Sequence, residues 1–233
     1  MNNLTPSVET RFFVLGEIHG ACENVHVLRD LLHFCGQKRT GEKTVFAFEW
    51  LLSSSESKVL NEYILGELDF NGEVKNIVKK LYSVESGAFS DQHLDFLAEV
   101  RQQNIKNGSQ IKIICFDSEA QSWNQRDKEM AEAIMRDSKD ASLVIIVTGS
   151  LHARKQSFTL EGEDGAFKPL ATYLPVNDTE TIRLHYKEGV IFNFGRQKIT
   201  KSDQPQDSSY YDNVYVLESA TPVTYEQKKR FDS

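Results

Sequence analysis

The sequence is poor in cysteine, glycine and proline, and each shortage excludes a class of protein. Its three cysteines, Cys22, Cys35 and Cys115, are odd in number and show no C-x-x-C spacing, so no complete disulfide framework is possible. With 13 Gly and 5 Pro in 233 residues, collagen-like and low-complexity classes are excluded as well. We expect the cysteines to be buried, reduced thiols of a cytoplasmic protein.

Long apolar runs and basic residues are equally scarce. The longest apolar runs, such as Leu143 to Val147, are far shorter than the roughly 20 residues of a membrane span. The opening segment MNNLTPSVET shows no secretory signal, so we expect a protein that is cytoplasmic, or secreted without a visible signal peptide. The 27 Lys and Arg against 34 Asp and Glu leave a net charge of −7, which argues against a nucleic-acid partner.

What the sequence does contain is the pattern of an α/β fold. Its 14 Phe, 8 Tyr and 2 Trp exclude a disordered chain. Short apolar runs alternate with segments of helical periodicity, as in a mostly parallel central sheet flanked by helices. We expect one domain over residues 1–233, with a core at about 11–175 and a strand-rich extension at 176–233. The expected core strands are residues 11–15, 44–48, 111–116 and 143–147; the expected helices are 23–34 and four more that follow caps at residues 53–55, 71, 90 and 124.

The chain beyond Pro169 changes character. Four short segments with polar alternation predict an antiparallel extension of the sheet: residues 181–186, 190–194, 197–200 and 214–217. The polar stretch at 201–213 predicts a long loop over the site.

Polar residues stand where the four core strands end. Glu17 and His19 follow the first strand, Glu49 the second, Asp117 the third and His152 the fourth. Ligands of open α/β sheets bind outside the carboxyl ends of the strands. If the strands are parallel, these five side chains converge on one edge of the sheet.

Two imidazoles and two carboxylates at such an edge allow two interpretations. Glu17, His19, Glu49 and His152 could ligate a divalent metal ion, as His and Asp/Glu do for zinc, iron or manganese. Alternatively, a histidine oriented by a carboxylate could act as a general base on water without a metal. Their spacing matches no local zinc signature, so both interpretations stay open.

Other polar residues have weaker patterns. Arg126, at the start of a helix, could clamp a carboxylate or stabilise an oxyanion; the alternative is a surface ion pair with Asp127 or Glu129. Asp117 is expected to support the centre from behind or to be structural. The remaining four histidines are expected to be structural: His26, His33, His93 and His185.

At these residues the chain resembles the erythromycin esterase/ChaN/Tiki superfamily, and the ChaN-like branch is nearest. The resemblance spans most of residues 11–175 and rests on five segments: VLGEIH (14–19), FAFEW (46–50), NQRDKEMAEAI (124–134), VTGSLHARK (147–155) and FKPLATYLP (167–175).

The resemblance implies an α/β fold whose polar centre consists of Glu17, His19, Glu49 and His152, with Arg126 nearby and Tyr173 as a further member. Activities in the superfamily include hydrolysis of a macrolide lactone, peptide-bond cleavage with or without metal, and haem binding.

Three functions follow as hypotheses. The first is a hydrolase of an ester or peptide bond with a small-molecule or peptide substrate, in which His19 or His152 activates water. The second is a haem or small-ligand binder that uses Tyr173 or Tyr210. The haem-binding ChaN proteins are lipoproteins, and no lipobox is visible here, which weakens an iron-uptake role. The third is a toxin-like domain that acts on a host protein.

Overall fold

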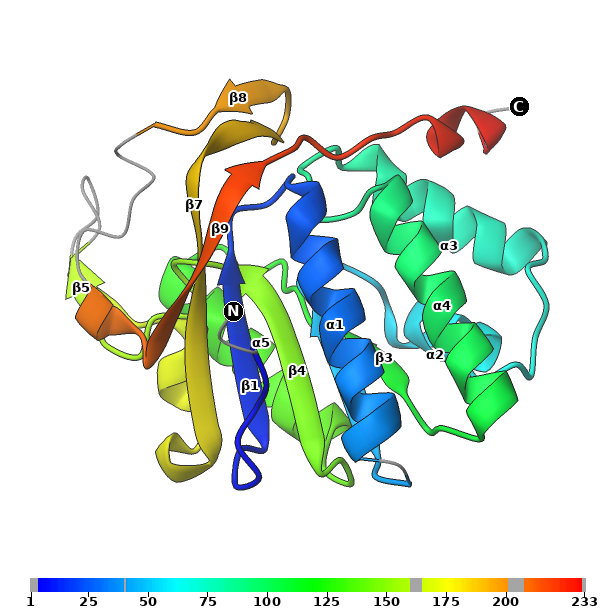
Figure 1. Cartoon of the computed structure of the whole chain (residues 1–233), viewed down its shortest axis with the longest axis horizontal. Coiled ribbons are helices and arrows are strands. Elements are labelled where there is room, and N and C mark those ends of the chain that lie inside the picture. Colours follow the sequence, from blue (N-terminus) through cyan, green and yellow to red (C-terminus); the bar gives the residue numbers. More distant parts are fainter. Residues whose placement is uncertain (1–3, 40, 160–164, 201–207, 232–233) are drawn as a thin grey trace.

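The computed structural model describes residues 4–39, 41–159, 165–200 and 208–231. It is an α/β structure in which one sheet lies between two layers of helices (Figure 1). The strands are β1 (Phe12–Glu17), β2 (Thr44–Phe48), β3 (Lys112–Cys115), β4 (Leu143–Gly149), β5 (Phe158–Thr159), β6 (Ala166–Phe167), β7 (Thr179–Phe192), β8 (Arg196–Lys198) and β9 (Asn213–Ala220). The α-helices are α1 (Cys22–Lys38), α2 (Ser54–Ile64), α3 (Gly72–Ser83), α4 (Asp91–Asn107) and α5 (Trp123–Asp137). Short 3₁₀ turns lie at Leu170–Tyr173, Val176–Asp178, Ser208–Tyr210 and Gln227–Arg230.

The main sheet has seven strands in the order β3-β2-β4-β1-β7-β8, and β9 also pairs with β7. All neighbouring pairs are parallel except β7 with β8. The predicted mostly parallel α/β fold is therefore confirmed. Among the described residues, antiparallel pairing joins β7 to β8, β5 to β6, and Ala21 to Pro222 in an isolated bridge. The predicted antiparallel extension is therefore found at β8, whereas β7 and β9 pair in parallel.

The C-terminal extension differs in detail from the sequence prediction. The segments predicted at 181–186 and 190–194 form one 14-residue strand, β7, that runs beside β1. Gly189 keeps the strand continuous, because it has φ +130° and a Cβ there would lie 2.3 Å from the carbonyl oxygen of Ala220 on β9. Of the predicted loop at 201–213, residues 201–207 lie outside the described residues.

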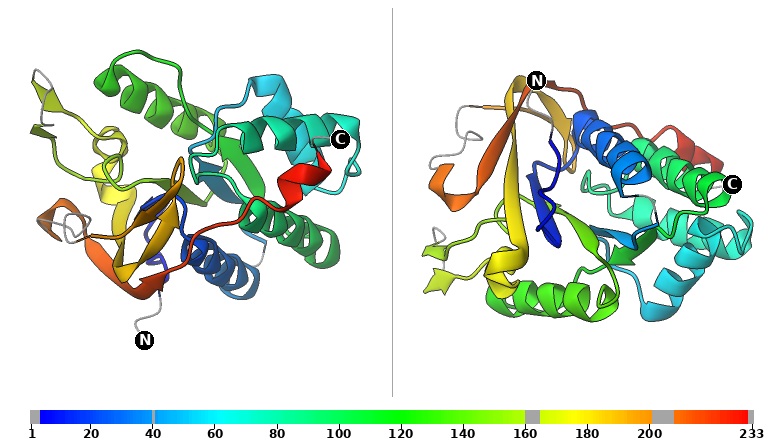
Figure 2. Two further views of the ribbon diagram at one scale, coloured as in Figure 1. Left: turned by 90° about the horizontal axis from the view of Figure 1, so that it is seen from above. Right: turned by 60° about the horizontal axis from the view of Figure 1, so that its bottom comes forward.

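Helices cover both faces of the sheet, and this explains the uninterrupted apolar runs of its strands. Phe13 of β1 and Phe46 of β2 face a core that also contains residues of α1, α2, α3 and α4. Phe12 and Val14 face the opposite core, which contains Met130 of α5. Figure 2 shows α5 on the side of the sheet away from α1 and α4. Each fully buried Phe contributes about 2 kcal/mol to stability through removal of apolar surface from water.

Most helix starts follow the predicted caps. Ser53 and Glu56 form a reciprocal capping box at α2, and Asn71 caps α3. The cap predicted at Asn124 is wrong: Ser122 accepts the N–H of Gln125 and α5 begins at Trp123. Asn124 instead binds the backbone of 166 and 168 from within the first turn.

The cysteines are unpaired, as predicted; Cys35 is buried, whereas Cys22 and Cys115 are half-buried. In the described part of the chain, no helix has the length and apolarity needed to cross a membrane.

Candidate active site

The carboxyl ends of β1, β2 and β4 bring together four of the predicted residues. Glu17 is the last residue of β1 and lies in register with Gly149, the last residue of β4. His19 follows β1, Glu49 follows β2 and His152 follows β4. Since β4 lies between β1 and β2 in the sheet, the loop after β4 stands between the other two.

Glu17, which is buried, and His19, which is partly exposed, form a carboxylate–imidazole pair. The Nδ1 of His19 lies 2.9 Å from Oε1 of Glu17, and its Nε2 lies 3.7 Å from Oε2 of Glu49. Burial by itself lowers the pKa of His19, but the hydrogen bonds to Glu17 and Glu49 outweigh it and raise this pKa to about 10. Burial raises the pKa of Glu17, whose Oε2 is buried without a hydrogen-bond partner. His19 is therefore an imidazolium at neutral pH.

Glu49 lies at the middle of the site, next to both imidazoles and Arg126. Its Oε2 accepts hydrogen bonds from Thr148 Oγ1 (2.7 Å) and from the N–H of Gly149 (2.9 Å). Its Oε1 accepts one from Nη2 of Arg126 (2.8 Å). Burial opposes ionisation, but the contact with His19 and the positive charges of His19 and Arg126 hold the pKa of Glu49 well below its ordinary value. Glu49 is thus a fixed negative charge.

His152 belongs to a second carboxylate–imidazole pair, and its partner is Asp127. Both carboxylate oxygens of Asp127 lie 2.8 Å from Nδ1 of His152, and Oδ2 also accepts the N–H of Leu170. Asp127 is fully buried, and the other ring nitrogen of His152, Nε2, lies 3.7 Å from Oε1 of Glu49. The two imidazoles therefore approach Glu49 from different sides, one at each carboxylate oxygen.

Sequence reasoning missed the role of Asp127, although a signal was present. Asp127, Met130, Ala131 and Ile134 follow the i, i+3, i+4, i+7 spacing of one helix face, and all four are buried. An acidic residue in an apolar stripe needs a buried partner. The surface ion pair between Arg126 and Asp127 was the wrong alternative, because adjacent helix residues point about 100° apart.

Arg126 links the centre to Asp117. Its Nε donates to Oδ1 of Asp117 (2.8 Å), and its Nη1 lies 3.4 Å from Nε2 of His152. Burial disfavours the charged guanidinium, but Glu49 and Asp117 raise the pKa of Arg126. Asp117 therefore holds the arginine in place and also lines the cavity described next.

A cavity of about 350 Å³ opens onto this centre. It is lined by His19, Glu49 and Arg126, by the aromatic rings of Trp50 and Phe89, and by residues of the loop between α3 and α4. The point that a Cβ on Gly149 would occupy lies 3.5 Å from Nε2 of His19, 3.4 Å from Cδ2 of His152 and 3.8 Å from Oε2 of Glu49. Glycine at this position leaves room for a small group between the two imidazoles.

Tyr173 is not brought into the centre. Its hydroxyl donates to the carbonyl oxygen of Asn124 (3.4 Å), and Nζ of Lys168 lies over its ring. Neither Tyr173 nor Tyr210, the two residues considered for haem, lines the cavity.

The remaining histidines also stay apart. His26 and His33 are exposed on α1, and His185 lies in β7. His93 is buried beside Trp50, and burial, with the charges of His19 and Arg29, lowers its pKa to about 3.

The four residues considered as metal ligands do not fit a metal ion. Within the described ranges, no group of three or more His, Cys, Asp or Glu side chains is arranged to hold one. The guanidinium of Arg126 already contacts both Glu49 and His152. A cation there would meet the positive charge of the arginine. The arrangement fits the metal-free interpretation.

Comparisons with known proteins give a likeness of fold. No family model and no curated protein matches the sequence. A crystal structure of a Bacillus cereus protein matches with a TM-score of 0.62 at 13% identity, covering 87% of this chain and 74% of that one. A succinoglycan biosynthesis protein matches with a TM-score of 0.63 at 12% identity, covering 94% and 86%. A mutant of the erythromycin esterase EreC in its open conformation matches at 12% identity over 86% and 77%, but its TM-score of 0.38 does not establish a shared fold. The first two structures therefore share the fold of this chain.

Proposed function

We propose that this protein is a hydrolase that cleaves an ester or peptide bond with a metal-free acid–base centre. The observation that carries the proposal is the pair of carboxylate–imidazole couples, Glu17–His19 and Asp127–His152, on either side of Glu49. A carboxylate that holds one ring nitrogen fixes the tautomer of a histidine and frees the other nitrogen for proton transfer.

In the proposed mechanism the two histidines have opposite roles. His152 takes a proton from water through Nε2, because Asp127 holds its Nδ1–H. The water oxygen attacks the substrate carbonyl carbon, and the negative charge that develops on the carbonyl oxygen is stabilised by Arg126. His19, already protonated at neutral pH, gives its proton to the leaving oxygen or nitrogen as the bond breaks. Water thereby supplies the hydroxyl group of the acid product. His152 then releases its extra proton to solvent and His19 takes one up from solvent, which restores the centre.

In this mechanism Glu49 positions the neighbouring groups and takes no part in the reaction itself. Its low pKa makes it a poor base, and three hydrogen-bond donors hold its two oxygens in place. The negative charge holds Arg126 beside the cavity, and an oxygen of Glu49 lies 3.7 Å from Nε2 of each imidazole.

The sequence resemblance supports the same reaction, since hydrolysis of a lactone and of peptide bonds are both activities of the superfamily. In this proposal residues 1–233 form one domain of that type. The pairing of β7 with β1 supports a single domain, since it joins the C-terminal extension to the core sheet.

The test is a screen of chromogenic esters and fluorogenic peptides with the purified chain and four variants. Glu17→Gln, His19→Ala and His152→Ala should each lower kcat at least a hundredfold, because each removes a proton-transfer group or its partner. His26→Ala is the matched control, since that histidine is exposed on α1. Full activity in both Glu17→Gln and His152→Ala on an identified substrate would contradict the proposal.

Gly149→Ala offers an independent check. The added methyl group meets only ordinary to slightly tight contacts and fills the space between the imidazoles. We expect it to abolish turnover while the urea midpoint of unfolding stays near that of the wild type.

A further inference from the structure

Two further cavities continue from the active-site cavity and form a groove along the edge of the sheet. Leu51, Lys80 and Asp117 line both the active-site cavity and a second cavity of about 620 Å³. That cavity in turn shares Phe116, Asp117 and Arg136 with a third, of about 540 Å³. We call the second and third cavities together the β3 groove.

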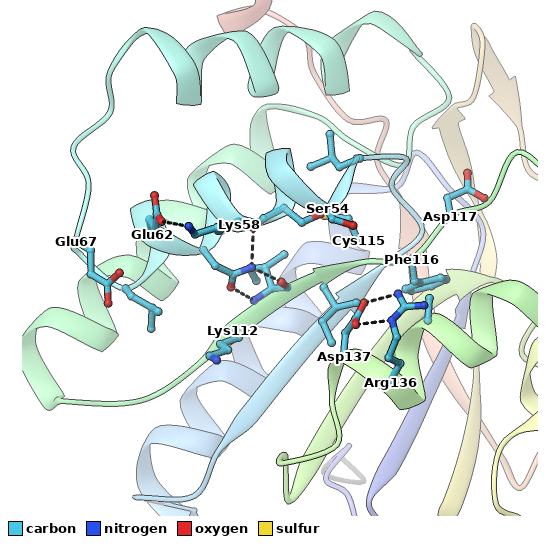
Figure 3. Close-up of a pocket in the computed structure, with 17 residues that line it drawn as sticks. Ser54, Lys58, Glu62, Glu67, Lys112, Cys115, Phe116, Asp117, Arg136 and Asp137 are labelled. Carbon is cyan, nitrogen blue, oxygen red and sulfur yellow. Dashed lines mark hydrogen bonds and ion pairs between the residues drawn. The ribbon is translucent and has the colours of Figure 1, made fainter.

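The β3 groove follows an edge strand. β3 pairs with β2 alone among the described strands, and α2 and α5 form the walls on either side of it. Figure 3 shows Lys112, Cys115, Phe116 and Asp117 in succession along this groove, with Lys58 on one wall and Arg136 on the other. The end marked by Asp117 is the end that meets the active site.

Two asparagine side chains cover part of the outer edge of β3 and of the residue just before it. Asn104 binds both the N–H and the carbonyl oxygen of Ile111, and Asn61 does the same for Ile113. Outward-facing backbone groups recur at every second residue of a strand. Cys115 is the next such position, and no hydrogen bond to its backbone is found among the described residues.

The edge is therefore closed at two positions and open at the one nearest the active site. An unpaired strand edge is the feature to which an extended peptide adds its own main chain. The side chains of the β3 groove are of mixed character: Leu52 and Phe116 are apolar, and Arg136 is already paired with Asp137. A lining of this kind suits the varied side chains of a peptide and not a chain of repeated like charges.

Building on the proposed hydrolase function, we propose that its substrate is an extended peptide that lies in the β3 groove and pairs with the N–H and carbonyl group of Cys115. The separation between Cys115 and Glu49 determines how long the peptide must be. Asp117 is two residues beyond Cys115, and one side chain each of Asp117 and Arg126 separates that point from Glu49. At about 3.3 Å per residue, roughly four residues of extended peptide reach from Cys115 to the active site at Glu49.

The experiment measures kcat/KM for a series of peptides lengthened one residue at a time on each side of the scissile bond. We expect a rise of about tenfold or more when the fourth residue on one side is added, as two main-chain hydrogen bonds form. A flat series, with short substrates still cleaved, would overturn the groove proposal and leave the hydrolase intact. No cleavage of any ester or peptide would instead remove the hydrolase itself.

Cys115→Pro and Cys115→Val separate main-chain pairing from side-chain packing. Proline removes the outward N–H at a position where an edge strand tolerates it, whereas valine keeps the N–H. We expect the ratio of kcat/KM for long and short peptides to fall about fivefold in Cys115→Pro and to be kept in Cys115→Val, with folding of both verified by circular dichroism. Equal ratios in the two variants would refute the pairing. So would a change in oligomeric state in Cys115→Pro alone, since that would assign the edge to a second copy of the chain.

Discussion

Replacement of Glu17 by Gln should lower the pKa of His19, and this effect can be measured without knowledge of a substrate. In the wild type, the hydrogen bonds to Glu17 and Glu49 raise that pKa to about 10 against the opposing effect of burial. A neutral amide at position 17 still accepts the Nδ1–H but no longer stabilises the positive charge. Glu49, 3.7 Å away, is unchanged, so the pKa falls without losing all support.

The same pair makes folding stability depend on pH. The folded-state pKa of His19 is raised above the ordinary 6.5, so its contribution is fully present below pH 6.5 and is lost as pH rises toward 10. For one such group, the free energy of unfolding falls by about 2 kcal/mol between pH 6.5 and 8.5. The Gln variant weakens this dependence without abolishing it, because Glu49 remains the only carboxylate beside His19. The variant should therefore show a flatter stability profile over this window.

The assays are NMR titration of the His19 ring and urea unfolding at intervals between pH 6.5 and 8.5. The window stays below pH 9, because burial raises the pKa of Cys35 to about 11 and of Cys115 to about 12, and these thiols add their own pH dependence above that point. Glu188→Gln, at an exposed position of β7, is the matched control. A His19 pKa near 6.5 in the wild type, or an equal pKa in Glu17→Gln, would refute this account of the site.

Three further predictions concern other parts of the chain. Asp127→Asn should lower the free energy of unfolding by about 3 kcal/mol in urea, because His152 and the N–H of Leu170 lose a buried carboxylate; an effect below 1 kcal/mol would contradict the assigned pair. Ser53→Ala should cost about 1 kcal/mol through loss of the α2 capping box, and an unchanged urea midpoint would argue against that cap. Glu85→Gly should raise Tm, with a gain of up to about 1 kcal/mol, because Glu85 has φ 49°; a lower Tm would show that its ion pair with Lys228 matters more than the backbone strain.

Much of the fold was predictable because its signals are local. The run from Val45 to Phe48 is apolar throughout, and a strand with helices on both faces requires that pattern. Ser53 and Asn71 cap their helices through neighbours two or three residues away. The cap predicted at Asn124 was wrong for the opposite reason. Its side chain forms hydrogen bonds with the backbone of residues 166 and 168, and no local pattern indicates those contacts.

The candidate site also has a part that was predictable from the sequence and a part that was not. The positions of Glu17, His19, Glu49 and His152 after strands predicted that they would meet, and three sheet neighbours bring them together. Which carboxylate serves which imidazole was not predictable. Asp127 reaches His152 from α5, 25 residues away along the chain.

The sequence by itself determined the alternation of strands and helices, most helix starts, and which residue types stand at the strand ends, since each of these depends on neighbours within a turn or a strand. Only the tertiary structure decided that β4 lies between β1 and β2, that β7 joins the sheet as one long strand, and that Arg126 contacts both Glu49 and His152. These outcomes depend on contacts between segments far apart in the chain, and the free energy of packing the whole core selects them.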